Sequence, residues 1–283
     1  MSIKRNFIIG DEWLYYKIYC ENQLADELLV LLSPILDKFI DDNRIDKWFF
    51  IRYSDPNNHI RIRFHFIDID NVLLVIKSLN KIFERYIHTD QIFKISCDTY
   101  RREIERYGAN TMELSENIFY SDSIAVSKFL TLQENKNEML RWAFALQSID
   151  CFFNEFGFTL EKKYQLITLM KDNFSQEFNV DKSQRIALDR KYRKYSVFIS
   201  EVFSKDNFIL NERMILNKLS VSELLEKEKQ DKLEMPLGSI LMSYIHMMNN
   251  RLFASKQRMN EMVIYYFLFK KYKSDLARLS SVV

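Results

Sequence analysis

Glycine and proline are scarce in this chain, which has only 4 Gly and 3 Pro among its 283 residues. These residues supply most tight turns, so their scarcity argues against an all-β sandwich with many short strands. It favours long helices combined with a small amount of sheet. Hydrophobic residues make up 47% of the chain, which is enough for a sizeable core in one large or two modest domains.

Cysteine is also scarce, and the common metal and nucleotide motifs are missing. The three cysteines are far apart, odd in number and without CxxC or Cys/His spacing: Cys20, Cys97 and Cys151. They are most simply reduced thiols of a cytoplasmic protein. The sequence contains no GxGxxG, P-loop or HExxH motif, so no short motif points to a nucleotide-binding or zinc-hydrolase class.

An excess of charge of one sign is missing as well, since the formal net charge is +2. This balance argues against nucleic-acid binding over a broad surface and still allows a local cationic pocket. No apolar run reaches membrane-spanning length, and the N-terminal apolar piece is too short for a signal peptide. We therefore expect a soluble cytoplasmic protein with no membrane span and no direct nucleic-acid partner.

The N-terminal part of the chain shows strand and helix patterns in turn. Aromatic and β-branched runs predict strands at residues 13–19, 48–53, 59–66 and 92–100. Apolar residues at helical spacing predict helices at residues 22–42 and 68–87. The resulting order, β-α-β-β-α-β, is the ferredoxin-like pattern.

From about Ser115 onward, the apolar period is helical almost throughout. It predicts helices at residues 115–132, 136–156, 159–175, 182–203, 211–229 and 237–273. We therefore predict an α+β fold in which a ferredoxin-like region, residues 1–112, packs on a mostly helical region, residues 113–283. No linker composition separates the two regions, so we expect them to share one core.

The segment His59 to Phe66 carries the most informative pattern, because side chains on a strand alternate between two faces. We expect the polar members to share one face: His59, Arg61, Arg63 and His65. Two arginines two residues apart repel each other unless anions bind them, and a guanidinium binds a carboxylate or phosphate through two hydrogen bonds. Taken alone, the spacing slightly favours a simpler alternative, a sheet with one face in water.

A second candidate is the segment Asp98 to Gly108, which leaves a strand and enters a turn or short helix. If it is helical, Arg102 and Arg106 lie on one face and can add to an anion pocket, with Glu103 orienting them. The alternative is a set of exposed ion pairs, each worth only tenths of a kcal/mol. Taken alone, the segment favours this alternative.

A third candidate is His246, which lies in a predicted helix rich in Ile, Leu and Met. Such a histidine is usually a satisfied core residue, and taken alone this explanation leads. Histidine is also the side chain best suited to proton transfer near neutral pH. Asn250 lies one helical turn later, where it can orient the ring.

Seven segments form a specific pattern when they are taken together in chain order. They are Trp13 to Tyr19, Trp48 to Pro56, His59 to Arg63, Tyr100 to Gly108, Glu116 to Phe119, Asp122-Ser123, and His246-Met247 with Asn250 to Leu252. The pattern covers most of the chain. It resembles the C-terminal elimination domain of class I lantibiotic dehydratases, and it is equally similar to the small split proteins of thiopeptide biosynthesis.

This resemblance implies a reaction and its partners. In that family, a partner domain or protein transfers glutamate from glutamyl-tRNA to Ser or Thr of a precursor peptide. The elimination domain then expels glutamate and leaves dehydroalanine or dehydrobutyrine. Because 283 residues cannot hold the glutamylating domain, the resemblance implies two partners, the precursor peptide and a separate glutamyl-tRNA-dependent glutamylating protein. It implies a homodimer as the oligomeric state, and no metal or organic cofactor.

The resemblance also implies which residues form the site. It assigns catalytic roles to Arg61, Arg63, Glu103, Arg106 and His246. We further expect substrate contacts from residues of the same segments: His59, Tyr100, Arg102, Asn250 and Arg251. The arginines are expected to bind the glutamyl carboxylates, and the histidine to transfer a proton. Glu103 is expected to hold an arginine or to share the proton transfer.

Two alternatives stay open. An enzyme of the same fold can build the pyridine core of thiopeptides by a formal cycloaddition of two dehydroalanines. Retention of the basic site residues favours elimination over that reaction. The other alternative is a non-catalytic protein that scaffolds the glutamylating partner or binds the leader peptide by strand addition at an exposed edge.

Overall fold

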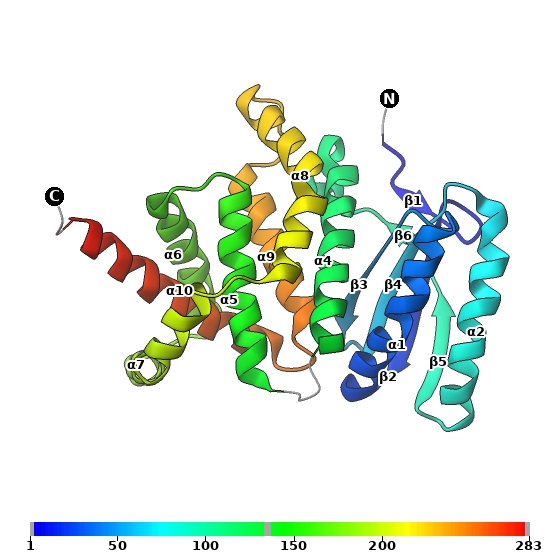
Figure 1. The fold of residues 1–283 in the computed structure, drawn as a ribbon, viewed down its shortest axis with the longest axis horizontal. Coiled ribbons are helices and arrows are strands. Elements are labelled where there is room, and N and C mark those ends of the chain that lie inside the picture. The colour runs from blue at the N-terminus through cyan, green and yellow to red at the C-terminus, as the bar shows by residue number, and fades with distance from the viewer. Residues whose placement is uncertain (1–2, 133–136, 281–283) are drawn as a thin grey trace. The chain divides into compact units, whose positions relative to one another are not determined.

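Two compact units make up the chain in the computed structural model, which describes residues 3–132 and 137–280 (Figure 1). The first unit is built from the described parts of Met1–Asn135 and Ile215–Ser255, and the second from those of Lys136–Met214 and Lys256–Val283. The helix α8 (Phe208–Lys229) contributes to both. This division differs from a single boundary near residue 112, because two later helices pack on the sheet of the first unit.

A four-stranded antiparallel sheet forms the centre of the first unit. Its strands are β2 (Trp13–Cys20), β3 (Lys47–Tyr53), β4 (His59–His65) and β5 (Ile92–Cys97), in the order β3-β4-β2-β5. The helices α1 (Asn22–Asp41), η1 (Ile69–Asn71) and α2 (Val72–His88) connect them. The predicted α+β class and the β-α-β-β-α-β order are confirmed. The ferredoxin-like description stays an interpretation of that order.

The alternation predicted for β4 separates the two faces of this sheet. Its apolar members are buried, as Phe64 illustrates with 0% exposure. Helices α1 and α2 cover this apolar face: Arg52 donates a hydrogen bond to Asp26 of α1 at 2.6 Å, and Tyr16 packs against Phe83 of α2 with ring centroids 6.4 Å apart. The polar row of β4 therefore lies on the opposite face, as predicted.

A second, two-stranded sheet, which the sequence pattern did not predict, pairs β1 (Asn6–Phe7) with β6 (Tyr100–Arg101). The strand predicted for residues 92–100 is interrupted, because β5 ends at Cys97 and the chain leaves the main sheet before Tyr100. Tyr100 stacks on Phe7 at 5.7 Å and meets Trp13 edge-on at 5.2 Å. The small sheet thus covers one end of the polar face, so that face is not simply open to water.

Besides the later turns of α8, the first unit contains the helices α3 (Ile104–Tyr107), η2 (Ala109–Thr111), α4 (Met112–Leu132) and α9 (Leu237–Leu252). Helices α4 and α9 cover the edge strand β3. Ser123 on α4 accepts a hydrogen bond from Phe50 N at 3.2 Å. Asn250 on α9 pairs its side-chain amide with both backbone groups of Arg52, at 2.8 and 2.9 Å. These contacts use edge groups that would otherwise pair with another strand.

The second unit is helical. It consists of α5 (Glu138–Glu155), α6 (Leu160–Glu177), α7 (Lys182–Phe203), the first turns of α8, and α10 (Gln257–Ser280). Its core holds a buried ion pair between Arg213 and Glu155, whose atoms lie 3.1 Å apart. Within the described ranges, no helix of either unit has the length and hydropathy to cross a membrane.

The single helix predicted for residues 237–273 is wrong, because the chain forms two helices there. Helix α9 ends at Leu252, Phe253 has extended backbone angles of φ −91° and ψ 114°, and Lys256 has a positive φ of 51° before α10 begins. No glycine or proline marks the break. Phe253 is apolar and only 3% exposed, so the helical spacing of apolar residues continues across the break. Hydrophobic spacing alone therefore gives no sign of the interruption.

Candidate functional site

A pocket opens on the polar face of the sheet in the first unit. Its volume is about 370 Å³, including space open to solvent. The side chains that line it include Arg63 of β4, Tyr100 of β6, Glu103 and Tyr107 at α3, and Met247 and Arg251 of α9. Three segments that are remote along the chain therefore meet at one place.

Arg63 places a buried cation in this pocket. Its side chain is 8% exposed, and its guanidinium lies 4.2 Å from the ring centroid of Tyr15 and 4.9 Å from that of Tyr100. Burial lowers the pKa of Arg63. Within residues 3–132 and 137–280, no carboxylate pairs with it and its buried Nε has no hydrogen-bond partner. A buried charge without a counter-ion is costly, so a ligand carboxylate would be strongly stabilised here.

Arg251 supplies a second buried cation, and this one is paired. It is 1% exposed, and its Nη1 lies 3.2 Å from Asp122 Oδ2 on α4. Burial lowers the pKa of Arg251; Asp122 opposes that effect, and repulsion by Arg63 adds to it. The two guanidinium groups are therefore close enough to interact, and the charge of Arg63, which no carboxylate pairs, favours an anionic ligand.

Glu103 and Arg106 lie at the short helix α3. Glu103 lines the pocket and is exposed, and its Oε2 lies 3.3 Å from Arg106 Nε. Gly108 ends the helix with a φ of +82°, and a Cβ there would approach Thr111 Oγ1 to 3.0 Å, so the turn requires glycine. Arg102 precedes α3, so the condition under which Arg102 and Arg106 would share a helix face is not met.

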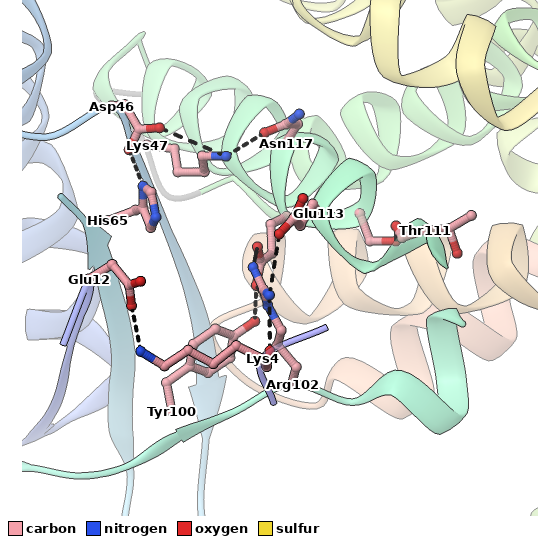
Figure 2. Close-up of polar contacts among 12 residues, drawn as sticks. Lys4, Glu12, Asp46, Lys47, His65, Tyr100, Arg102, Thr111, Glu113 and Asn117 are labelled. Atoms are coloured by element: carbon pink, nitrogen blue, oxygen red, sulfur yellow. Dashed lines mark hydrogen bonds and ion pairs between the residues drawn. The ribbon is translucent and has the colours of Figure 1, made fainter. Parts of the chain in front are cut away.

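One buried carboxylate, Glu116 of α4, holds both Tyr100 and Arg102. Figure 2 shows these two side chains close together. Arg102 donates from Nε and Nη2 to the two oxygens of Glu116, both at 2.7 Å, and the Tyr100 hydroxyl donates to Oε1 at 2.8 Å. Burial and the neighbouring carboxylate raise the pKa of Tyr100 well above its usual value. Arg102 also donates to Lys4 O at 3.0 Å. These bonds fix β6 against α4.

His59 and Arg61 lie on the same sheet face as Arg63 but outside the pocket lining. Arg61 Nε donates to His59 Nε2 at 3.0 Å, and its guanidinium lies 3.5 Å from the ring centroid of Tyr53. His59 Nδ1 contacts Asn57 O at 2.8 Å, so this nitrogen carries the ring proton. Desolvation lowers the pKa of His59. The pair extends the polar row of β4 beyond the pocket.

His246 lies on α9, one residue before the pocket-lining Met247. Helix α9 packs against α3, where Tyr107 stacks on Tyr244 with ring centroids 5.6 Å apart. This packing brings the helix of His246 next to the Glu103–Arg106 turn. The imidazole itself is partly buried and is not among the lining residues. Asn250, one turn later, binds the backbone of β3.

The structure thus gathers part of the predicted set in one pocket: Arg63, Tyr100, Glu103 and Arg251. The others lie on the same or neighbouring elements without lining it: His59, Arg61, Arg102, Arg106, His246 and Asn250. Their roles stay predictions. Sequence reasoning missed Tyr107 as a lining residue, and it missed that Glu116 and Asp122 neutralise two of the arginines. A signal existed for these carboxylates, because a charged residue among the apolar positions of a helix needs a cationic partner.

Comparison with known proteins gives this arrangement a family. The family described as "Lantibiotic biosynthesis dehydratase C-term" matches residues 13–272. The chain is 30% identical over 280 residues to the nisin biosynthesis protein NisB of Lactococcus lactis subsp. lactis, covering 96% of this chain and 26% of NisB. It is 25% identical over 269 residues to the subtilin biosynthesis protein SpaB of Bacillus subtilis, covering 90% of this chain and 25% of SpaB. The chain therefore spans about a quarter of the length of these relatives.

Solved structures show a similar fold. The tRNA dependent lantibiotic dehydratase MibB from Microbispora sp. 107891 matches with a TM-score of 0.70 and 19% identity, covering 96% of this chain and 29% of that chain. The pyridine synthase TbtD from thiomuracin biosynthesis matches with a TM-score of 0.63 and 9% identity, covering 95% of this chain and 100% of TbtD. Because the family match covers most of the sequence, this chain belongs to the family of lantibiotic biosynthesis dehydratase C-terminal domains.

Proposed function

We propose that this chain eliminates glutamate from glutamylated Ser or Thr residues of a ribosomally made precursor peptide, leaving dehydroalanine or dehydrobutyrine. Family membership supports this proposal. The observation that carries it is Arg63, a buried guanidinium with no carboxylate partner among the described residues. A glutamyl group brings a carboxylate to the pocket, and its departure as glutamate produces a second one.

The proposed reaction is a β-elimination that needs no oxidant or reductant. A base removes the Cα proton, the electron pair forms the Cα–Cβ double bond, and the Cβ–O bond breaks with release of a carboxylate. Arg63 and Arg251 line the pocket in which negative charge develops on the leaving oxygen, so they are proposed to stabilise it. Arg61, two residues from Arg63 on the same face, is proposed to guide the anionic substrate inward.

His246 is the proposed proton-transfer group. Its helix packs on the turn that carries Glu103 and Arg106, and histidine exchanges protons near neutral pH. Glu103 is proposed to orient Arg106, since their side chains are 3.3 Å apart. Glutamylation itself is proposed to come from a separate glutamyl-tRNA-dependent protein.

One observation favours a second candidate, formation of a pyridine ring from two dehydroamino acids. TbtD, a pyridine synthase, shares this fold with a TM-score of 0.63. The substrate of that reaction is already dehydrated and carries no glutamyl carboxylate. It would leave the Arg63 guanidinium without an anionic ligand, so the pocket supports elimination better.

Two synthetic peptides separate these candidates. The first carries a glutamylated Ser, and we expect the chain to convert it to the dehydroalanine peptide with release of glutamate. Mass spectrometry detects both products. The second carries two dehydroalanines, and we expect it to remain unchanged. Retention of glutamate in the first peptide together with ring formation in the second would replace elimination by cycloaddition.

A further inference from the structure

A second, wider pocket lies on the polar face of the sheet. Figure 2 shows several of its lining side chains, among them Lys4, Glu12 and His65. It encloses about 910 Å³, including space open to solvent, and its polar lining residues are Lys4, Glu12, His65, Arg102, Asn110 and Glu113. His65 lies two residues beyond Arg63 on β4. Arg102 directly follows Arg101, which lines the first pocket. The two pockets are therefore neighbours, and the proposed elimination gives the second one no role.

His65 offers this pocket one imidazole nitrogen. Its Nδ1 lies 2.5 Å from Asp46 Oδ1, and Lys47, 3.9 Å from Asp46 Oδ2, also donates to Asn117 at 2.9 Å (Figure 2). The ring of Trp13 packs against the imidazole with centroids 4.8 Å apart. Because Nδ1 is held by the carboxylate, Nε2 is the ring nitrogen left for a ligand, and it accepts a hydrogen bond whenever the ring carries a single proton. No other side chain in the described part of the chain bonds to His65, so a ligand can donate to it.

The two cations that line the second pocket, Lys4 and Arg102, are already paired with carboxylates of the chain. Lys4 binds Glu12 at 2.9 Å, and Arg102 binds both oxygens of Glu116. Glu113, whose side chain is 69% exposed, lies 3.5 Å from Arg102 Nη1. That distance suits an ion pair but exceeds a normal hydrogen bond. The Glu113 oxygens therefore remain available to a donor from a ligand.

The charges around this pocket are negative in sum. The three cations are Lys4, Lys47 and Arg102, and the five carboxylates that contact them or line the pocket are Asp11, Glu12, Asp46, Glu113 and Glu116. The whole chain, in contrast, carries a formal charge of +2. A local excess of carboxylates beside an available imidazole acceptor favours a cationic ligand.

We propose that the second pocket binds a lysine or arginine side chain of the peptide that is modified in the first pocket. The ammonium or guanidinium would donate to His65 Nε2 and to Glu113 through charge-assisted hydrogen bonds. Residues two apart on a strand are separated by roughly 7 Å, and an extended peptide has the same spacing. When the modified Ser or Thr lies at Arg63, a basic residue two positions away in the peptide therefore lies at His65. This inference rests on the proposed function for the peptide nature of the ligand.

Binding of unmodified peptides to the full chain tests the inference without requiring elimination. The two peptides are identical except at one position, two residues away from a Ser. One peptide has lysine there and the other has norleucine. We expect the lysine peptide to bind about fivefold more tightly, as one partly exposed charge pair predicts. It should also shift the NMR signals of the His65 ring. Equal affinities would overturn the inference.

Matched variants locate the effect. Glu113→Gln is expected to abolish the preference for lysine, whereas Glu84→Gln, which changes an exposed carboxylate of α2, is expected to keep it. A lysine preference that survives in Glu113→Gln and in His65→Gln would place the cation elsewhere and refute this pocket.

Glutamylated versions of the same peptides separate this inference from the proposed function. Elimination without a lysine preference would refute the second pocket and leave the proposed function intact. A lysine preference in a chain that releases no glutamate would refute the elimination and retain the peptide-binding pocket.

Discussion

Arg63 combines a functional position with an unfavourable one for stability. Its charge is buried among aromatic rings without a carboxylate partner in the described residues. Methionine has a similar shape and no charge, so Arg63→Met removes the desolvation cost. We expect the free energy of unfolding to rise by about 1 kcal/mol, measured by urea denaturation. A loss of stability instead would show that Arg63 serves the fold more than a ligand.

His59 makes stability depend on pH. Its pKa is lowered, mainly by desolvation, with repulsion from Arg61 adding to the effect. The unfolded chain therefore binds the proton at higher pH than the folded chain, and stability rises with pH across this interval. The contribution is complete above the ordinary histidine pKa of 6.5 and is lost as pH falls below it.

Comparing His59→Gln with the wild type measures this contribution. Between about pH 7.5 and 5.5, the wild type is expected to lose more stability in urea unfolding than the variant. Glutamine keeps a donor and an acceptor for the neighbouring groups but does not titrate. Equal losses in the two proteins would assign the pH dependence to other groups.

The candidate site was only partly predictable residue by residue. The two-residue spacing on β4 correctly placed Arg61 and Arg63 on one face, since alternation is local. It could not tell that Tyr100 covers Arg63, because that contact joins segments remote in sequence. Nor could it tell that Arg61 stacks on Tyr53, because that contact depends on the register of two consecutive strands. The same limit applies to Arg102, whose partner Glu116 follows it across a turn and a helix start.

At the scale of elements, the edge of β3 is closed by side chains of two helices. Asn250→Ala removes both hydrogen bonds to the Arg52 backbone. We expect it to destabilise the chain by about 2 kcal/mol, because it leaves two backbone groups without their partner. Asn80→Ala, on an exposed position of α2, is the control and should be nearly neutral. Thermal or urea unfolding measures both.

The alternative outcome for Asn250 is informative as well. If Asn250→Ala leaves stability unchanged and weakens binding of a glutamylated peptide, the residue contacts substrate, as predicted from the sequence. If stability falls and the affinity of the folded protein is kept, its role is to seal the edge strand.

Periodicity was sufficient for most elements and failed where tertiary contacts decide. The four main strands and both helices between them follow directly from alternating or helical spacing. The two-residue strands β1 and β6 are too short to leave a pattern, and they exist because Phe7 and Tyr100 stack. The break between α9 and α10 has no local signal, since the buried Phe253 fits the helical period.

At the scale of the whole molecule, the chain corresponds to about a quarter of the lantibiotic biosynthesis proteins it resembles. Both pockets lie in the first unit, on the polar face of its sheet. That face joins a cationic pocket to one with excess carboxylates, which suits an extended peptide bearing an acidic modification and a basic neighbour. We propose that the cationic pocket holds the glutamyl group during elimination.

The role of Arg63 can be measured by comparing the release of glutamate by the wild type and by Arg63→Met from the same glutamylated peptide. We predict that Arg63→Met, although folded, slows release by roughly 100-fold and leaves the glutamylated peptide intact in mass spectra. Arg85→Gln, an exposed arginine on α2, should release glutamate at the wild-type rate. Undiminished release by folded Arg63→Met would contradict the account.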